Sequence, residues 1–181
     1  MKWKPFAAAL VLFILMLANT LHADTPSPKV IRKQLLEALD RRSLTDSLYN
    51  TLSAEPNKSP QYLCYLGVVQ ALKAKHAWNP YYKVKYLNDS EKTLQQAINH
   101  EPDNIEIRFM RFSIEHNVPG FLGYGKHLVA DREEMIKQLN AKHYGTADKD
   151  VVITIIKFLL DSKRCTLHEN ETLKKQLAAL K

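Results

Sequence analysis

The chain has 181 residues, of which 45% are hydrophobic, 25% charged and 9% aromatic, and these proportions exclude a disordered, a collagen-like or a polytopic membrane protein. Lys and Arg number 26 against 19 Asp and Glu, which gives a formal net charge of +7. Because the charges are interspersed and form no long basic run, we expect no nucleic-acid partner. The length predicts a single domain, and the low count of 5 glycines favours helices over tight β-hairpins.

The N-terminus has the layout of a secretory signal peptide. Lys2 and Lys4 precede an unbroken apolar run over 6–18, and a short polar stretch then ends at Ala23, where cleavage is expected. As a helix the apolar run would reach about 20 Å, whereas a bilayer core is roughly 30 Å thick. We therefore expect no membrane span after signal cleavage.

The expected product is an exported protein, in the periplasm or outside the cell of a bacterial source, with a signal peptide over 1–23 and a mature domain over 24–181. An uncleaved anchor is the alternative, because Leu21 is bulkier than the small residue preferred at that position. Cys64 and Cys165 would then lie in an oxidising compartment, which permits one disulfide between them. Two buried free thiols fit the sequence equally well.

The mature chain is predicted to be helical throughout. Leu44, Leu48 and Leu52 recur four residues apart, as on one face of a helix, and Ser59 followed by Pro60 is a typical helix start. The expected elements are a leader over 24–28, helix pairs over 29–56, 60–102 and 104–141, and an apolar helix followed by a capping helix over 150–181. The sequence thus predicts an all-α fold of about seven helices in antiparallel hairpins.

Two segments depart from this regular pattern. The β-branched run over 151–156 is compatible with a strand, but helix is favoured because no partner strand is visible elsewhere. In the middle pair, Pro80 marks a break after the first helix. The second helix is expected to begin at a cap within 88–90 and to end at Pro102, which leaves 78–88 as an irregular insertion.

The middle pair resembles a tetratricopeptide repeat. Leu66-Gly67 matches the Leu-Gly of that family's first helix, and Ala97 followed by Pro102 resembles the end of its second helix. Gly67 and Pro102 lie 35 residues apart, about 11 more than the family's spacing, and the surplus falls in the irregular insertion. The resemblance covers 43–116 and implies a tetratricopeptide-like stack that acts as a binding or scaffold module. The chain is also similar to an uncharacterised group of small exported bacterial proteins, which implies no activity.

Motifs for catalysis or cofactor binding are incomplete. Gly120 and Gly125-Lys126 have the spacing of a phosphate-binding loop, but His127 stands where that loop needs Ser or Thr to hold magnesium. The histidines do not have the spacing of a zinc site, and no serine-hydrolase motif occurs. We therefore expect no cofactor, no metal and no enzymatic activity.

Aromatic and basic residues concentrate in two segments, which supply the candidate residues for binding a partner. These are Trp78, Tyr81, Tyr82, Lys83 and Tyr86 in the first segment, and Phe121, Tyr124 and Lys126 in the second. Because the corresponding loops of stacked helix pairs project from one side, we expect the aromatic side chains of the two segments to meet. They would form either a plug of the irregular end or a surface whose lysines face an acidic protein partner.

The predicted function is a binding or scaffold module for protein–protein interaction. The alternative is a small-ligand-binding protein or an enzyme that uses a loop cluster of His116, Tyr124 and His127. A deep pocket with converging polar groups would favour the alternative, whereas a shallow concave surface would favour the module.

Overall fold

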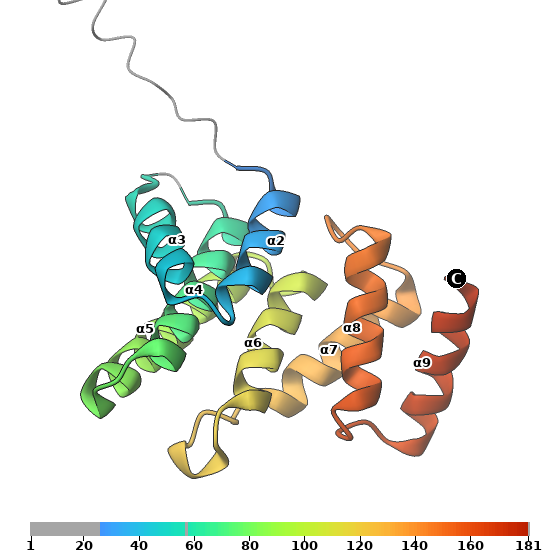
Figure 1. The fold of residues 1–181 in the computed structure, drawn as a ribbon. Helices are drawn as coiled ribbons and strands as arrows, with labels where there is room; N and C mark the ends of the chain where they lie inside the picture. The colour runs from blue at the N-terminus through green and yellow to red at the C-terminus, as the bar shows by residue number, and fades with distance from the viewer. Residues whose placement is uncertain (1–25, 57, 181) are drawn as a thin grey trace, which may run out of the picture.

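A computed structural model describes residues 26–56 and 58–180, and within them the chain forms eight α-helices, one short 3-10 helix and no β-strand (Figure 1). The elements are α2 (Pro28–Ala38), α3 (Arg42–Ala54), α4 (Pro60–His76), α5 (Pro80–His100), α6 (Ile105–Asn117), η1 (Gly120–Leu122), α7 (Leu128–Ala141), α8 (Lys149–Asp161) and α9 (Leu167–Ala179). The predicted all-α class is confirmed, with eight α-helices in place of about seven. The expected signal peptide over 1–23 lies outside the described residues.

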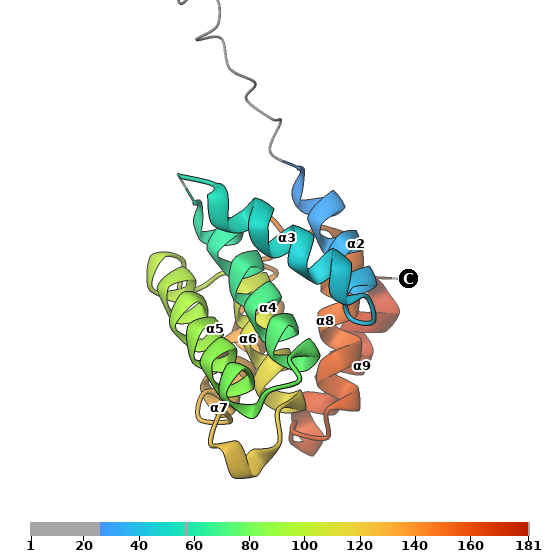
Figure 2. The ribbon, with the colours of Figure 1, turned by 60° about the vertical axis from the view of Figure 1, so that its left-hand side comes forward.

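The helices pack as four consecutive hairpins. α2 contacts α3, α4 contacts α5, α6 contacts α7, and α8 contacts α9. The first helices of successive hairpins also contact one another, α2 with α4, α4 with α6, and α6 with α8. Figures 1 and 2 show the hairpins side by side in chain order. Neighbours in the sequence are therefore neighbours in space, as in a stacked array.

Most helices begin where the sequence supplies a cap. Ser59, Asn104 and Asp148 each accept a hydrogen bond from a main-chain N–H in the first turn of α4, α6 and α8, respectively. Thr166 and Glu169 form a capping box at the start of α9. α8 is helical along its whole β-branched run, as predicted from the sequence.

The irregular insertion predicted over 78–88 is wrong. α5 begins at Pro80 and continues without a break to His100, so most of the expected loop forms its first turns. The Asn79 side chain caps this start by accepting a hydrogen bond of 2.9 Å from the N–H of Tyr81. Pro80 occupies the first turn, where its missing N–H has no partner to lose. The Asn79-Pro80 pair, predicted to interrupt the helix, instead begins one. The residues in excess of the tetratricopeptide spacing are therefore additional helix.

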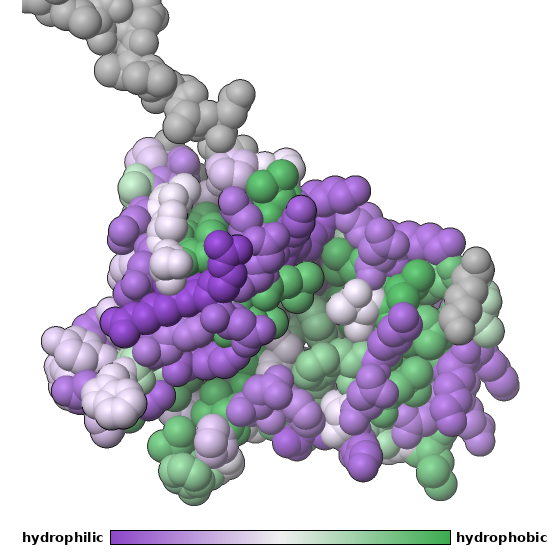
Figure 3. Space-filling view, viewed as in Figure 1, coloured by the Kyte–Doolittle hydropathy of each residue, from purple (hydrophilic) through white to green (hydrophobic). Residues whose placement is uncertain are grey.

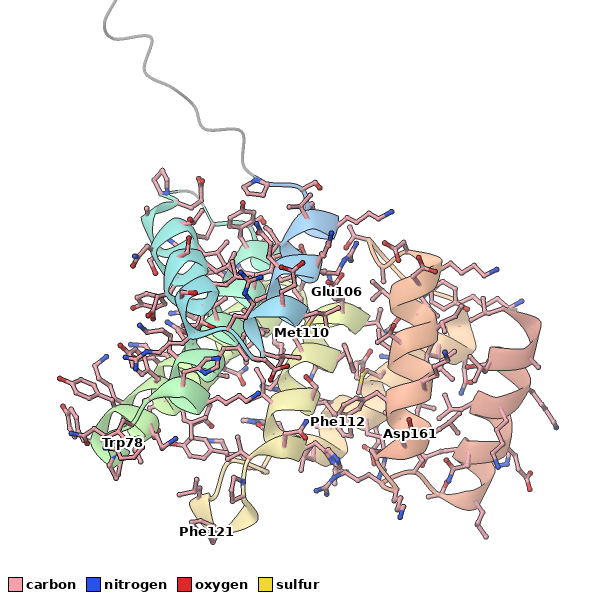
Figure 4. The ribbon with its side chains drawn as sticks, in the orientation of Figure 1. Trp78, Glu106, Met110, Phe112, Phe121 and Asp161 are labelled. Atoms are coloured by element: carbon pink, nitrogen blue, oxygen red, sulfur yellow. The ribbon has the colours of Figure 1, made fainter. Side chains whose placement is uncertain are left out.

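Three apolar clusters form the core. One lies among α2, α3 and α4 and includes Leu52, a second includes Leu94 of α5, and the third lies among α6, α7, α8 and α9 and includes Phe112. Met110 of α6 packs against all three clusters (Figure 4). The core is therefore continuous along the stack.

None of the helices in the described part of the chain combines the length and apolar character that a bilayer span requires.

A buried polar network ties the first helices of the hairpins together. The carboxylate of Glu106 on α6 is 1% exposed and accepts hydrogen bonds from Arg32 of α2 at 2.9 Å and from the Tyr65 hydroxyl of α4 at 3.1 Å. Arg32 also pairs with Asp148, at the start of α8, at 2.9 Å. Burial raises the pKa of Glu106, against the opposing effect of Arg32 and Tyr65. Four helices of the stack thus meet at one ion-pair network.

Candidate functional site: a basic aromatic cleft

The structure contains a cleft of about 300 Å³ between α3, the end of α4 and the start of α5. Its lining combines aromatic rings with basic groups and one acid, namely Trp78, Tyr82, Tyr86, Arg42, Lys73, His76 and Asp46. The cleft is open to solvent, so it can admit a side chain or a short peptide segment.

The aromatic wall of the cleft follows from where α5 begins. Since Pro80 starts the helix, Tyr82 and Tyr86 lie one turn apart on the same face, and their rings stack with centroids 6.3 Å apart. Tyr49 of α3 meets the Tyr86 ring edge to face, also at 6.3 Å. The first turns of α5 are thereby fixed against α3 by ring contacts. An irregular loop would not hold these rings in this arrangement.

A lysine stands at the centre of this wall. The Nζ atom of Lys73 lies 5.3 Å from the ring centroids of both Tyr49 and Tyr86, and 2.6 Å from Oδ1 of Asp46. Partial burial disfavours its charge, but the hydrogen bond and charge of Asp46 more than offset this and raise the pKa of Lys73. The ammonium therefore remains charged at neutral pH and supplies a fixed positive group in the cleft.

The mouth of the cleft carries an unshielded tryptophan. Trp78 lies between the end of α4 and the start of α5 and is 94% exposed (Figure 4). The neighbouring His76 is anchored, because its Nε2 lies 2.9 Å from the Ala38 carbonyl at the end of α2. Of the remaining predicted residues in this segment, Tyr81 is exposed, and Lys83 donates to the carbonyls of α4's last turn at 3.4 Å.

The predicted meeting of the two aromatic segments is wrong. Phe121 in η1 is 87% exposed, so its ring does not pack on the aromatic start of α5. The second segment contacts α5 further along, through polar groups. The Tyr124 hydroxyl donates a hydrogen bond of 2.7 Å to Oδ1 of Asn88, and Lys126 pairs with Glu91. The unbroken α5 helix explains this arrangement. Its first turns direct the Tyr86 ring toward α3, whereas its middle turns, with Asn88 and Glu91, face the segment that contains Tyr124 and Lys126.

The alternative cluster of His116, Tyr124 and His127 does not converge. His127 pairs with Glu115, with 2.6 Å between Nδ1 and Oε1. His116 stacks on Phe112 and accepts a hydrogen bond of 2.9 Å from Nε of Arg164, and burial together with that arginine lowers the pKa of His116. The hollow beside Tyr124 and Glu115 holds about 10 Å³. That volume is about the space for one water molecule.

The two cysteines are free thiols that belong to different parts of the core. Cys64 is fully buried beside Leu94, whereas Cys165 is partly buried near the end of α8, with its Sγ 3.6 Å from the Leu159 carbonyl. The disulfide left open by the sequence is therefore not formed in this structure. Within 26–56 and 58–180, no three His, Cys, Asp or Glu side chains are placed to share a metal ion.

Sequence reasoning missed half of the cleft. Arg42 and Asp46 come from α3, and Lys73 and His76 come from the last turn of α4. In the sequence each of these residues is an ordinary polar position of a helix. Arg42 and Asp46 reach the aromatic segment only because α3 packs on α4, and no local pattern records that packing.

Comparison with known proteins adds no relative. No protein-family model matches the chain. Neither the curated proteins nor the solved structures gave a significant match.

Proposed function

We propose that this chain is an exported, non-enzymatic binding module, built as a tetratricopeptide-like stack, that captures an acidic segment of a partner protein in the cleft between α3, α4 and α5. The proposal rests on the groups that line this cleft. It takes the partner to be a protein because aromatic and basic side chains at the mouth of an open cleft are the usual anchors of protein interfaces.

The observation that carries the proposal is the exposure of Trp78. A tryptophan side chain gains free energy when it leaves water, and at 94% exposure this gain is still available to a partner. Tyr82 and Tyr86 form the adjoining wall and lose little conformational entropy on binding, because their rings are already packed. Tyr82 and Tyr86 therefore form a preorganised aromatic wall beside the exposed ring of Trp78.

The charge of the cleft supports an acidic occupant. Arg42 and Lys73 are opposed within the lining by a single carboxylate, that of Asp46. Asp46 lies 2.6 Å from Lys73 and 3.9 Å from Arg42, so it cannot neutralise both cations. A carboxylate from a partner would complete the charge balance and gain favourable electrostatics.

The arrangement of the hairpins supports the repeat-like architecture. Each first helix packs on the next first helix, which is the pattern of helical-repeat stacks. Gly67 of α4, the glycine of the resemblance, lies against Leu94 of α5. Close approach of two helices at a glycine is the physical role that such a position requires.

Selection from a displayed library of random peptides tests the proposed function. We expect the protein to enrich peptides that combine Asp or Glu with an aromatic or aliphatic residue. Tyr82→Ala should lose this enrichment because it removes one of the stacked rings, whereas Phe121→Ala, an exposed aromatic outside the cleft, should retain it. Enrichment of basic peptides, or equal enrichment by both variants, would contradict the proposal.

Export is tested separately by the mass of the protein isolated from its native source. Cleavage after Ala23 predicts a mature chain that begins at Asp24. An intact N-terminus would instead support the uncleaved anchor.

A further inference from the structure

Three hairpin connections lie along one edge of the stack. They join α4 to α5, α6 to α7, and α8 to α9, and in both Figure 1 and Figure 2 they occupy the lower side of the molecule. The arrangement follows from the fold, because the hairpins lie side by side and point the same way. We call this the loop edge and define it by residues 73–88, 116–130 and 162–168.

Each connection of the loop edge presents one large apolar side chain to solvent. Trp78 is 94% exposed, Phe121 87% and Leu167 85%, and these are the three highest exposures among the large hydrophobic residues that the structure describes. In Figure 3 the apolar surface protrudes at the bottom of the molecule over η1 and over the start of α9. Trp78 and Phe121 point away from the helices in Figure 4. Among the described residues, none of these three side chains belongs to an apolar cluster of the core.

The loop edge is predominantly basic. Its three segments contain seven Lys or Arg residues and no Asp or Glu, and acidic residues adjoin their ends at Asp89, Glu115, Asp131, Asp161 and Glu169. Some of these cations are neutralised by neighbouring helices, as Lys126 is by Glu91. Lys83, Lys163 and Arg164, however, form no ion pair with any residue in the described ranges. Each of the two outer loops therefore combines an exposed apolar side chain with cations that lack a carboxylate partner.

We propose that the loop edge docks on an anionic phospholipid surface. Trp78, Phe121 and Leu167 would enter the headgroup region, and Lys83, Lys163 and Arg164 would lie near lipid phosphates. Separate tips on three loops suit a broad, flat, deformable surface, whereas a protein partner places its anchors together in a packed pocket. Tryptophan favours the membrane interface because its ring is apolar and its N–H remains hydrated. Clustered Lys and Arg add attraction to anionic lipids.

The middle loop is held in position before any docking. The Tyr124 hydroxyl is hydrogen-bonded to the Asn88 side chain. The main-chain N–H of His127 donates to Oε2 of Glu115 at 2.9 Å, and Nδ1 of His127 lies 2.6 Å from Oε1 of the same carboxylate. Gly123, with a φ of 77°, supplies the left-handed turn that ends η1. Presentation of Phe121 therefore requires no ordering of the loop, and less free energy is lost on docking.

Binding to lipid vesicles tests this inference directly. The chain beginning at Asp24 contains every described helix and all three core clusters, and Trp78 is then its only tryptophan. With vesicles of phosphatidylcholine and phosphatidylglycerol at 7:3, we expect co-sedimentation and a blue shift of Trp78 fluorescence. Vesicles of phosphatidylcholine alone should bind at least tenfold more weakly, because they offer no net negative charge.

Variants of the loop edge separate the apolar and electrostatic contributions. Phe121→Ser and Leu167→Ser should each weaken binding to anionic vesicles by about tenfold, and Lys163→Gln by about fivefold. Val30→Ser is the matched control, because Val30 is an exposed apolar residue in the first turn of α2, outside the loop edge. This variant should bind as the parent does. Tyr82→Ala should also bind vesicles normally, because the Tyr82 ring stacks on Tyr86 in the cleft and is not one of the three exposed side chains at the loop tips. This variant therefore distinguishes docking on lipid from peptide capture in the cleft.

Several outcomes would overturn the inference. One is an absence of binding to the anionic vesicles, and another is binding that Phe121→Ser and Leu167→Ser leave unchanged. A third is concentration-dependent dimerisation in sedimentation velocity that Phe121→Ser abolishes, since the loop edge would then be an interface between two copies. A fourth is loss of peptide capture by the loop-edge variants without vesicle binding by the parent, which would make the edge part of a protein interface.

Discussion

The hydroxyl of Ser90 on α5 donates a hydrogen bond of 2.7 Å to the main-chain carbonyl of Gly67 on α4, and both groups are buried. A Cβ atom at position 67 would lie 2.7 Å from Cγ of Leu94, closer than van der Waals contact allows. The absence of a side chain at Gly67 thus lets α5 approach the backbone of α4. This contact fixes the hairpin whose connecting turn lies at the cleft.

Gly67→Ala should destabilise the protein by about 1 kcal/mol. Alanine is the better helix former by about 1 kcal/mol, but overpacking against the buried Leu94 costs about 1 to 3 kcal/mol. In a Leu94→Ala background the clash is removed, so the same substitution should become stabilising. Gly120→Ala is the control, because nothing lies within 4 Å of its added Cβ. Urea unfolding of the parent and of these variants measures the free energies, and a stabilising Gly67→Ala in the parent would refute the close approach.

Asp131→Asn should cost about 3 to 5 kcal/mol of unfolding free energy. Both oxygens of the fully buried Asp131 on α7 accept hydrogen bonds of 2.7 Å from Arg111 on α6, and Arg108 adds a third at 2.9 Å. The neutral amide would leave the guanidinium of Arg111, 4% exposed, without a buried counter-charge. Glu37→Gln, which breaks an exposed pair with Arg41, should change stability by less than about 0.5 kcal/mol. Equal effects of the two substitutions in chemical denaturation would contradict this account.

Glu106 should make the protein less stable as pH rises. The pKa of Glu106 in the folded protein is raised above the ordinary 4.5. Between pH 4.5 and this raised pKa, the folded state therefore binds more protons than the unfolded state. The unfolding free energy due to this group is therefore highest below pH 4.5 and falls as pH rises through the raised pKa. Glu106→Gln removes the titration. The stability of the variant relative to the parent should increase from pH 4 to pH 7, and a decrease over that range would show that the pKa is lowered.

The two cysteines should react as free thiols of unequal accessibility. Burial raises the pKa of the Cys64 thiol, and the partial burial of Cys165 raises its pKa too. Both thiols therefore stay protonated at neutral pH and react slowly with iodoacetamide. Native protein should label at Cys165 before Cys64, because Cys165 is only partly buried. After unfolding without reductant, mass spectrometry should find both sites alkylated. Protein from its native source that remains unlabelled when unfolded would instead contain the disulfide.

Local patterns predicted the helices well, because helix starts are encoded by neighbouring residues. Ser59-Pro60, Asn104 and Asp148 cap helices in the structure, and each is visible in the sequence. The start at Asn79-Pro80 was misread because an Asn-Pro pair can either interrupt a helix or begin one. The residues after it have no aliphatic stripe, since their face contacts Tyr49 of α3 and Lys73 of α4. A periodicity argument based on aliphatic residues therefore misses this part of α5.

The candidate cleft was predictable only in part. The sequence identified Trp78, Tyr82 and Tyr86, because a concentration of aromatic residues is visible without a structure. It did not identify Lys73 or Asp46, whose roles depend on α3 lying across the hairpin of α4 and α5. The expected contact between the aromatic segments failed for the same reason, since the direction of a ring depends on whether its backbone is helix or loop.

The most direct test of the cleft is the affinity of Trp78→Ala for an acidic peptide selected by the parent protein. Because Trp78 is almost fully exposed, its replacement should leave the unfolding free energy unchanged, so a loss of binding reports on the cleft alone. Isothermal titration should show the dissociation constant of Trp78→Ala raised at least about thirtyfold, which corresponds to about 2 kcal/mol. Phe121→Ala should bind as the parent does. An unchanged affinity for Trp78→Ala, or an equal loss for Phe121→Ala, would contradict the account.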